Sequence, residues 1–261
     1  MGFYAHASTS TATEMRFGVY VPPRTDGARL PVLYYLAGLT CTEDTFLIKA
    51  GAQQFAAAAG LILVAPDTSP RGVELPGDRE HWDFGVGAGF YVDATEAPWA
   101  QHYRMYSYVV DELPALIEAN FPASGRRGIF GHSMGGHGAL VVALRNPARY
   151  HSVSAFAPIA NPVAVPWGEK AFSRYLGADR SRWEAYDASC LLRRSEAGRD
   201  VLVDQGLADQ FLERELHPEA LEAAGPRVTV RRHPGYDHSY WFIQTFIADH
   251  IAWHRDRLRA A

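Results

Sequence analysis

The sequence predicts an α/β fold in a single domain over residues 1–261, with a mostly parallel central sheet flanked by helices. Short apolar runs alternate along the chain with longer segments of helical spacing, which is the pattern of a parallel sheet wound by helices. Runs such as residues 32–36 are continuously apolar, as expected for strands covered on both faces. A content of 48% hydrophobic and 21% charged residues supplies a sizeable core, and no linker or repeat interrupts the chain.

The first half of the chain begins with an alternating segment that is typical of an antiparallel strand and stops at Pro22 and Pro23. Gly60 closes a helical segment, and Pro114 predicts a kink in the next one. We therefore expect strands at residues 15–21, 32–36 and 61–65, and helices at residues 45–59 and 102–120.

Residues 68–99 lose this periodicity. The stretch is rich in glycine and proline, and it carries Trp82, Phe84, Phe90 and Tyr91. A loop of this length inside a compact domain is uncommon and usually functional. Its aromatic side chains either line a pocket or anchor the loop to the core, and anchoring is the commoner role for any one of them.

The second half resumes the alternation. Asn146 and Pro147 stop one helical segment, and Gly225 and Pro226 stop a later one. We expect strands just before residue 131 and at residues 153–156, 200–203 and 228–230, and helices at residues 134–146, 211–224 and 239–258. Residues 160–187 are irregular to helical and predict an insertion over the strand ends.

Residues 131–135 read Gly-His-Ser-Met-Gly, a G-x-S-x-G pattern between an apolar run and a helical segment. In such a nucleophile elbow a strand ends, the chain turns sharply at the serine, and a helix begins. Sterics require glycine at positions 131 and 135, because the turn leaves no room for a Cβ atom on either side of Ser133. The context therefore indicates Ser133 as a nucleophile.

A serine hydroxyl needs a base to take its proton and an acid to hold that base in one tautomer. In open α/β sheets these groups follow the carboxyl ends of late strands, in the order Ser, acid, His. Of the eleven histidines, His238 fits best, because it follows the last strand by a short loop. Asp204 and Asp209 both follow the strand at 200–203. We expect Asp204 to bond turn N–H groups and prefer Asp209 as the acid.

An oxyanion intermediate needs two N–H donors. One is expected from Met134, directly after the nucleophile, and the other from Leu39 in the loop after the strand at 32–36. Cys41 lies beside that loop in the sequence. It is either a thiol at the mouth of the site or a small buried hydrophobic residue, and the sequence favours neither.

Composition excludes several classes of function. A net charge of −4 without a basic run argues against nucleic acid, and no apolar run is long enough to span a bilayer. No signal peptide is evident, and two cysteines, Cys41 and Cys190, indicate a reducing cytoplasm rather than a disulfide framework. No metal or nucleotide motif appears, so we expect neither a metal nor a cofactor.

Seven motifs together resemble the S-formylglutathione hydrolase family, also called esterase D. They are residues 36–42 (LAGLTCT), 82–85 (WDFG), 87–95 (GAGFYVDAT), 131–140 (GHSMGGHGAL), 166–168 (PWG), 204–206 with 208–209 (DQG and AD) and 235–240 (GYDHSY). The resemblance runs nearly end to end. It implies an α/β-hydrolase fold and hydrolysis of S-formylglutathione to formate and glutathione, a step of formaldehyde detoxification.

The resemblance also assigns residues. The family's serine, acid and histidine fall on Ser133, Asp209 and His238, its oxyanion donors on Leu39 and Met134, and its cysteine near the active site on Cys41. Family members are cytoplasmic and often dimeric, so a homodimer is a further expectation. The chain begins shortly before the motifs, and we expect the family's first edge strand to be short or missing.

The formyl group is small, so a narrow acyl pocket is expected, with Trp82, Phe84 and Trp167 as its walls. The sequence does not choose among basic residues such as Lys49, Arg104 and Lys170 for the glutathione carboxylates. Two alternatives use the same residues. One is a general carboxylesterase for acetyl or feruloyl esters, and the other is a hydrolase-like binding protein that has lost its chemistry.

Overall fold

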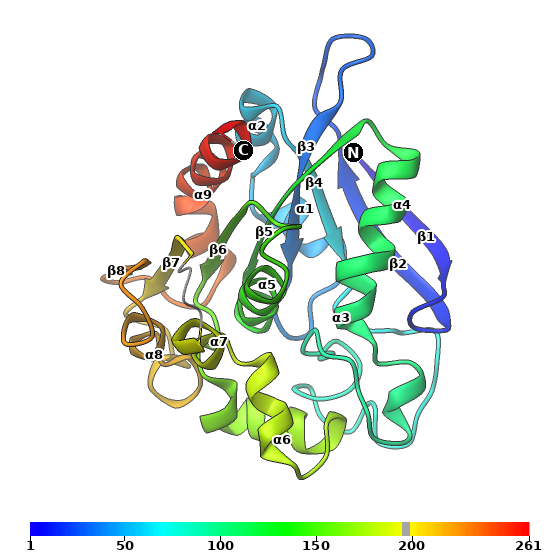
Figure 1. Cartoon of the computed structure of the whole chain (residues 1–261), viewed down its shortest axis with the longest axis vertical. Coiled ribbons are helices and arrows are strands. Elements are labelled where there is room, and N and C mark those ends of the chain that lie inside the picture. The colour runs from blue at the N-terminus through cyan, green and yellow to red at the C-terminus, as the bar shows by residue number, and fades with distance from the viewer. Residues whose placement is uncertain (195–198, 261) are drawn as a thin grey trace.

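Eight strands form one sheet in the computed structural model, which describes residues 1–194 and 199–260 (Figure 1). The strand order is β1-β2-β4-β3-β5-β6-β7-β8. The strand β2 pairs antiparallel with both β1 and β4. From β4 through β3, β5, β6 and β7 to β8, all neighbouring strands are parallel. The strands are β1 Gly2–Ser8, β2 Thr13–Tyr20, β3 Leu30–Leu36, β4 Ile62–Pro66, β5 Ala123–His132, β6 Ser152–Phe156, β7 Val201–Gly206 and β8 Val228–His233.

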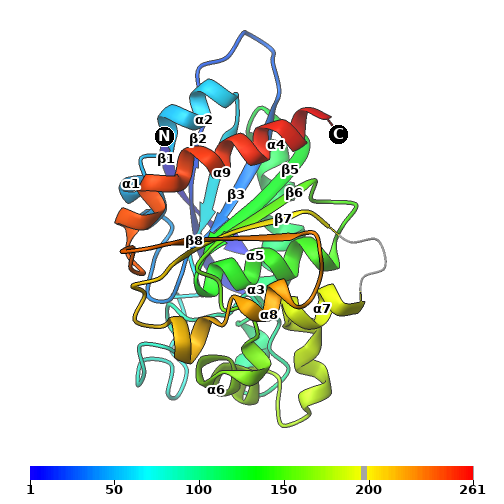
Figure 2. The same ribbon diagram turned by 90° about the vertical axis from the view of Figure 1, so that its left-hand side faces the viewer.

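Helices cover both faces of this sheet. The helices α2 and α9 contact each other on one face, while α5 packs against β3, β5 and β6 on the other (Figures 1 and 2). The helices are α1 Thr45–Lys49, α2 Gln53–Ala59, α3 Met105–Ser107, α4 Leu113–Asn120, α5 Met134–Arg145, α6 Pro166–Tyr175, α7 Ala188–Arg194, α8 Glu219–Glu222 and α9 Tyr240–Ala260. Because both faces are covered, β4, β6 and β7 are buried along their whole lengths.

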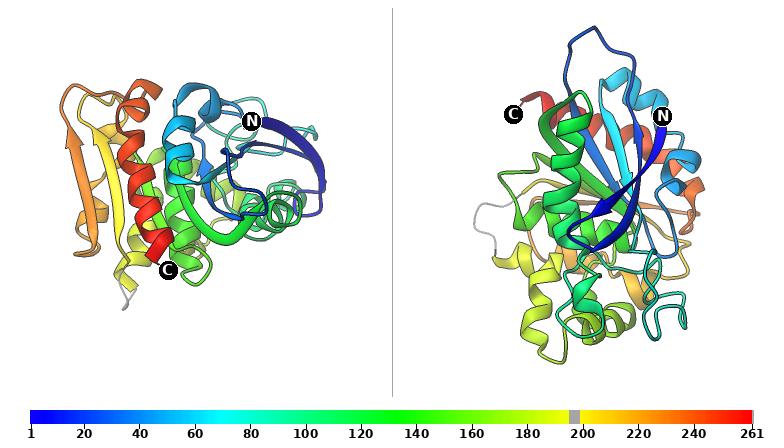
Figure 3. Two further views of the ribbon diagram at one scale, coloured as in Figure 1. Left: turned by 90° about the horizontal axis from the view of Figure 1, so that it is seen from above. Right: turned by 90° about the vertical axis from the view of Figure 1, so that its right-hand side faces the viewer.

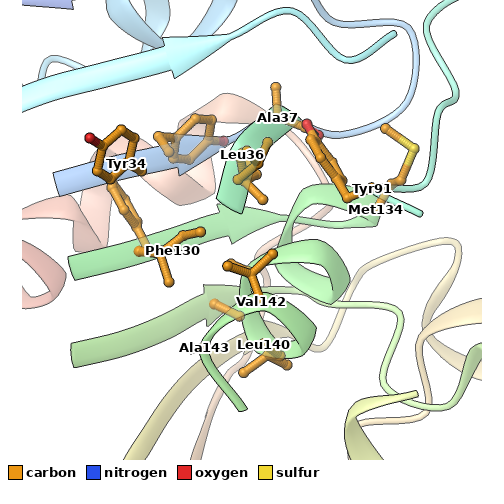
Figure 4. Close-up of a cluster of buried hydrophobic side chains, with 14 of the residues drawn as sticks. Tyr34, Leu36, Ala37, Tyr91, Phe130, Met134, Leu140, Val142 and Ala143 are labelled. Atoms are coloured by element: carbon orange, nitrogen blue, oxygen red, sulfur yellow. The ribbon is translucent and has the colours of Figure 1, made fainter. Parts of the chain in front are cut away.

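Buried side chains of β3, β5 and α5 meet in the core. Tyr34 and Leu36 of β3, Phe130 of β5 and Leu140 of α5 are fully buried there (Figure 4). The Tyr91 hydroxyl, from the long loop, donates to the Ala37 carbonyl oxygen at 2.9 Å. This packing fixes the end of β3 against the start of α5, where Gly38 passes close to Ser133.

The predicted α/β-hydrolase fold is confirmed, and the expectation of a short or missing first strand is wrong. The strand β1 pairs with β2 over seven residues at one edge of the sheet (Figure 3). Its side chains are anchored by aromatic contacts: Tyr4 stacks on Phe17 at 5.5 Å, and His6 stacks on Tyr108 at 5.7 Å between ring centres. Tyr108 is 102 residues from His6 along the chain, so the local sequence gives no signal of this contact.

Two predicted helices are broken. The segment at 45–59 forms α1 and α2, separated at Gly51, whose φ of 63° is incompatible with a continuing helix. The segment at 211–224 forms a π-helical turn at Leu212–Leu216 and then α8, because His217 adopts a left-handed φ of 48° immediately before Pro218. Helical periodicity continues across both breaks, which is why it concealed them.

The helix expected at 102–120 begins later, at Met105, and contains a π-helical turn at Tyr108–Glu112. This widened turn directly precedes Pro114, and it takes the place of the simple kink that the proline predicted. The insertion expected at 160–187 is largely helical, with α6 and short 3-10 turns at Pro162–Ala164 and Arg180–Tyr186.

Candidate active site

The carboxyl ends of the parallel strands surround a pocket of about 280 Å³. Ser133 after β5, the loop after β3, and His238 after β8 all contribute to its wall. The lining residues are Gly38, Leu39, Thr40, Cys41, Thr45, Lys49, Trp82, His132, Ser133, Trp167, Phe211, His238 and Tyr240. The structure therefore gathers residues predicted from five separate segments into one cavity.

Ser133 lies between β5 and α5 with φ 57° and ψ −121°, a strained backbone conformation for a residue with a side chain. Its N–H donates to the Phe156 carbonyl oxygen at 3.0 Å, which ties the turn to β6. A Cβ atom on Gly135 would lie 2.0 Å from the Leu36 oxygen, and one on Gly131 would lie 2.2 Å from the Gly135 oxygen. Only glycine fits at either position, so the strand–elbow–helix geometry expected from the motif is present.

Asp209 and His238 are joined by a hydrogen bond. The His238 Nδ1 atom lies 2.5 Å from Asp209 Oδ2, and both side chains are buried or nearly so. Asp209 is itself held in place, since its Oδ1 accepts from the Phe211 N–H at 2.8 Å and its Oδ2 from Gln205 Nε2 at 3.4 Å. The carboxylate thus orients one ring nitrogen of His238 and leaves Nε2 free of it, as a general base requires.

His132 lies against His238, with 4.3 Å between the ring centres. Burial, and then the neighbouring His238, hold the pKa of His132 well below its usual range, so the ring is neutral at neutral pH. Its Nε2 atom is buried and makes no hydrogen bond with any residue that the structure describes. A neutral neighbour lets His238 accept a proton without repulsion from a second positive charge.

Asp204 does not bond turn N–H groups, so that expectation is wrong. Its carboxylate is buried and accepts two hydrogen bonds of 2.6 Å from Arg231. Burial alone would raise the pKa of Asp204, but hydrogen bonds from His250 and Arg231 outweigh it and lower the pKa below its usual range. Arg231 lies opposite Asp204 on the neighbouring strand β8. The sequence around Asp204 does not show which residue of another strand will pair with it.

Asp204 also belongs to a second string of Ser, His and Asp side chains. Ser152 Oγ lies 2.6 Å from His254 Nδ1, Ser154 Oγ lies 2.8 Å from His254 Nε2, and His250 Nε2 lies 3.3 Å from Asp204 Oδ2. All of these side chains are buried beneath α9, and none lines the active-site pocket. With no access for a substrate, this string is a structural network that links α9 to β6 and β7.

The two expected oxyanion donors belong to the segments next to Ser133. Met134 is the first residue of α5, where N–H groups have no partner within the helix. Leu39 lines the pocket, and no hydrogen bond in the described part of the chain uses its N–H. A Cβ atom added to Gly38 would lie 3.2 Å from the Ser133 Cβ, so this loop passes close to the nucleophile.

Aromatic rings form one wall of the pocket. Trp82 meets Trp167 edge-on at 5.7 Å, Trp167 lies 4.7 Å from Phe211, and Phe211 lies 5.0 Å from His238, all between ring centres. Phe84 is not part of this wall, so its expected role is wrong. It is buried beneath the loop, where it stacks on Tyr175 at 4.6 Å.

Phe211 and Tyr240 were missed by the sequence reasoning. Each follows a catalytic candidate by two residues, Phe211 after Asp209 and Tyr240 after His238. The Tyr240 hydroxyl lies 3.3 Å from that of Tyr35, which fixes the ring against β3. An aromatic residue two positions after a catalytic candidate in the sequence is the signal that could have identified both.

Cys41 lines the pocket as a free, half-buried cysteine. Burial raises the pKa of its thiol, although a hydrogen bond with Tyr240 and the nearby Lys49 act in the opposite direction. The thiol is therefore protonated at neutral pH and is a poor nucleophile. A role at the mouth of the site stays a prediction.

Within residues 1–194 and 199–260, no group of three or more His, Cys, Asp or Glu side chains is arranged to hold a metal ion. In the same part of the chain, no helix combines the length and apolarity needed to cross a membrane.

Three comparisons place the chain among known proteins. The family model of putative esterases matches residues 8–253. The S-formylglutathione hydrolase of Mus musculus is 55% identical to it, over 98% of this chain and 94% of the mouse protein. That of Paracoccus denitrificans is 53% identical, over 98% of this chain and 93% of the bacterial protein. A solved S-formylglutathione hydrolase from Agrobacterium tumefaciens is 50% identical, with a TM-score of 0.95 over 98% of this chain and 95% of that chain. A solved ferulic acid esterase, 19% identical with a TM-score of 0.74 over 98% of this chain and 97% of that chain, shares the fold.

Proposed function

The chain belongs to the S-formylglutathione hydrolase family of esterases and is a hydrolase, and from that premise we propose that it cleaves S-formylglutathione to formate and glutathione. The observation that carries the proposal is identity above 50% to such hydrolases over nearly the whole chain. The pocket geometry supports it, because a serine on a strained elbow and a carboxylate-bound histidine line one cavity. A serine and a carboxylate-bound histidine in one cavity are the groups that acyl transfer to a serine requires.

In the proposed mechanism, Nε2 of His238 takes the proton of Ser133 while Oγ attacks the thioester carbonyl carbon. The negative charge on the carbonyl oxygen is stabilised by the N–H groups of Leu39 and Met134. The carbon–sulfur bond then breaks, and the sulfur leaves as a thiol with the proton from His238. Asp209 holds His238 in the required tautomer and stabilises its charged form through the 2.5 Å hydrogen bond.

The remaining formyl ester on Ser133 is hydrolysed by water. His238 again acts as the base, removing a proton from the water that attacks the formyl carbon. Formate leaves, and the serine recovers its proton from His238. Both halves use the same donors and the same base, so a single pocket suffices for the whole reaction.

Comparison of thioester and ester turnover tests the assignment. We expect kcat/KM for S-formylglutathione to exceed that for p-nitrophenyl acetate by about 100-fold or more, since tripeptide contacts add transition-state binding. If the simple ester is the better substrate, the enzyme is a general short-chain carboxylesterase. If a serine-directed fluorophosphonate fails to label Ser133, the chain is a binding protein.

We propose that Leu39, Trp82, Trp167 and Phe211 restrict the acyl group to a small size. An added methylene in a closed apolar pocket changes binding by about 10-fold or more. We therefore expect p-nitrophenyl butyrate to have a kcat/KM about 10-fold or more below that of the acetate.

Two matched substitutions locate this restriction. Trp167→Leu is expected to raise the ratio of kcat/KM for the butyrate to kcat/KM for the acetate. Phe84→Leu should leave this ratio unchanged, because the Phe84 ring is buried outside the pocket. A ratio near one in the unmodified enzyme would show that the pocket is wide.

We extend the proposal to a cytoplasmic location and a homodimer. Both cysteines are free, which suits a reducing compartment. The dimer rests on the resemblance to a family whose members are often dimeric. Light scattering across a concentration series tests it, since a constant monomer mass would contradict the dimer.

A further inference from the structure

The chain contains only two lysines, Lys49 and Lys170, and both lie at the active-site opening. Each borders a hollow that adjoins the pocket containing Ser133. The two hollows differ in the charges on their walls, and this difference can determine which end of the glutathione leaving group binds in which hollow. The inference rests on the proposed function, because it concerns how glutathione is held.

The first hollow has a volume of about 640 Å³ and shares Lys49 and Tyr240 with the catalytic pocket. Its other lining residues are Ser239, Trp241 and Gln244, so Lys49 is the only charged side chain that the described part of the chain places on its wall. No carboxylate within the described residues forms an ion pair with Lys49, whose ammonium lies 5.7 Å from the centre of the Tyr240 ring.

The acid nearest to this hollow along the chain is Asp237, which does not line it. Its Oδ1 accepts from the Ser239 N–H at 3.0 Å and from the Ser239 hydroxyl at 2.6 Å. Lys49 is also the only Asp, Glu, Lys or Arg side chain among the residues that line the catalytic pocket. The surroundings of Lys49 therefore favour a ligand with a net negative charge.

The second hollow, of about 510 Å³, shares Trp82, Trp167 and Phe211 with the catalytic pocket. Its charges are paired: Lys170 Nζ lies 2.5 Å from Asp83, and Arg214 Nε lies 3.4 Å from Glu215. With two cations and two anions on its wall, this hollow matches a ligand that carries both signs of charge.

Glutathione has two chemically different ends on either side of its cysteine. The glycine end carries a single carboxylate, and the γ-glutamyl end carries a carboxylate and an ammonium on one carbon. The glycine end is anionic and the γ-glutamyl end is zwitterionic. When the cysteine sulfur is at Ser133, the two ends leave it along different branches of the peptide. The two hollows likewise adjoin the catalytic pocket through different residues and share no lining residue with each other.

We propose that Lys49 binds the glycine carboxylate of the glutathione moiety and that the γ-glutamyl end occupies the hollow of Lys170 and Asp83. Lys49 is thus a specificity residue for the leaving tripeptide. Arg104, the third basic candidate from the sequence, lines neither hollow and lies 3.9 Å from Asp93.

The test uses S-formylglutathione and its analogue with a glycine carboxamide in place of the glycine carboxylate. In the unmodified enzyme the carboxamide should lower kcat/KM by about three- to tenfold, mainly through KM, as expected for one partly exposed ion pair. In Lys49→Ala the two substrates should react equally well. Each ratio compares two substrates on one preparation, so it does not depend on the fraction of active enzyme.

Lys170→Ala is the matched control, since it removes the only other lysine. It should keep the full three- to tenfold preference for the glycine carboxylate. The proposal is overturned if the unmodified enzyme reacts equally well with the carboxamide, or if Lys49→Ala keeps the preference for the glycine carboxylate. The proposed function is tested separately. It fails if kcat/KM for p-nitrophenyl acetate exceeds that for S-formylglutathione.

Discussion

Replacement of Ser133 with alanine is expected to lower kcat for S-formylglutathione by on the order of 10⁵- to 10⁶-fold, because the substitution removes the atom that forms the acyl-enzyme. Ser133 makes few contacts that alanine would lose, and its strained backbone conformation is imposed by the surrounding glycines and β6. We therefore expect the variant to remain folded. Steady-state kinetics with circular dichroism as the measure of folding would check both expectations.

Ser152→Ala is the matched control, because Ser152 also bonds a histidine but is buried in the network beneath α9. It should keep most of the turnover. Loss of its hydroxyl leaves His254 Nδ1 without a partner, which is expected to lower the free energy of unfolding by about 1–3 kcal/mol. Turnover that survives Ser133→Ala but vanishes in a folded Ser152→Ala would reverse the assignment of the nucleophile.

Replacement of Asp209 with asparagine is expected to lower kcat by on the order of 10⁴-fold. The amide is nearly isosteric, but it favours the tautomer of His238 that carries its proton on Nε2, where the base must accept one. The effect should appear in kcat with a much smaller change in KM, because Asp209 does not line the pocket.

Asp204→Asn is the control for this substitution. Asp204 is at least as buried as Asp209, but its partners are Arg231 and His250 rather than His238. Its loss leaves Arg231 without its buried anion, so we expect about 3–5 kcal/mol of destabilisation, measured by urea unfolding, with kcat per folded molecule largely retained. A 10⁴-fold loss of kcat in folded Asp204→Asn, with Asp209→Asn active, would exchange the roles of the two acids.

The predictions that succeeded depended on short-range chemistry. The turn at Ser133 admits only glycine at its flanks, so the motif at 131–135 determines its own backbone geometry. The parallel sheet could be predicted because strands covered on both faces are mostly apolar, as β4 is along its whole length. The carboxyl ends of such strands meet at one edge, and this brings the loops of Asp209 and His238 to the elbow.

The predictions that failed depended on partners distant in the sequence. Helical periodicity at 45–59 and 211–224 did not reveal the breaks at Gly51 and His217, because a change of backbone direction can preserve the spacing of apolar residues. Strand β1 owes its place to pairing with β2 and to contacts such as that of His6 with Tyr108. Phe84, an aromatic residue beside Trp82, is buried because Tyr175 covers it.

The sequence by itself determined the fold, the position of the elbow at Ser133 and the order of the residues expected to act with it, since each follows from local sterics and from the geometry of a parallel sheet. Only the tertiary structure decided which carboxylate contacts His238, which aromatic rings reach the pocket, and which lysine lacks an acid beside it. These are properties of pairs of side chains from distant segments. Their distances arise only when the helices and loops have packed against the sheet.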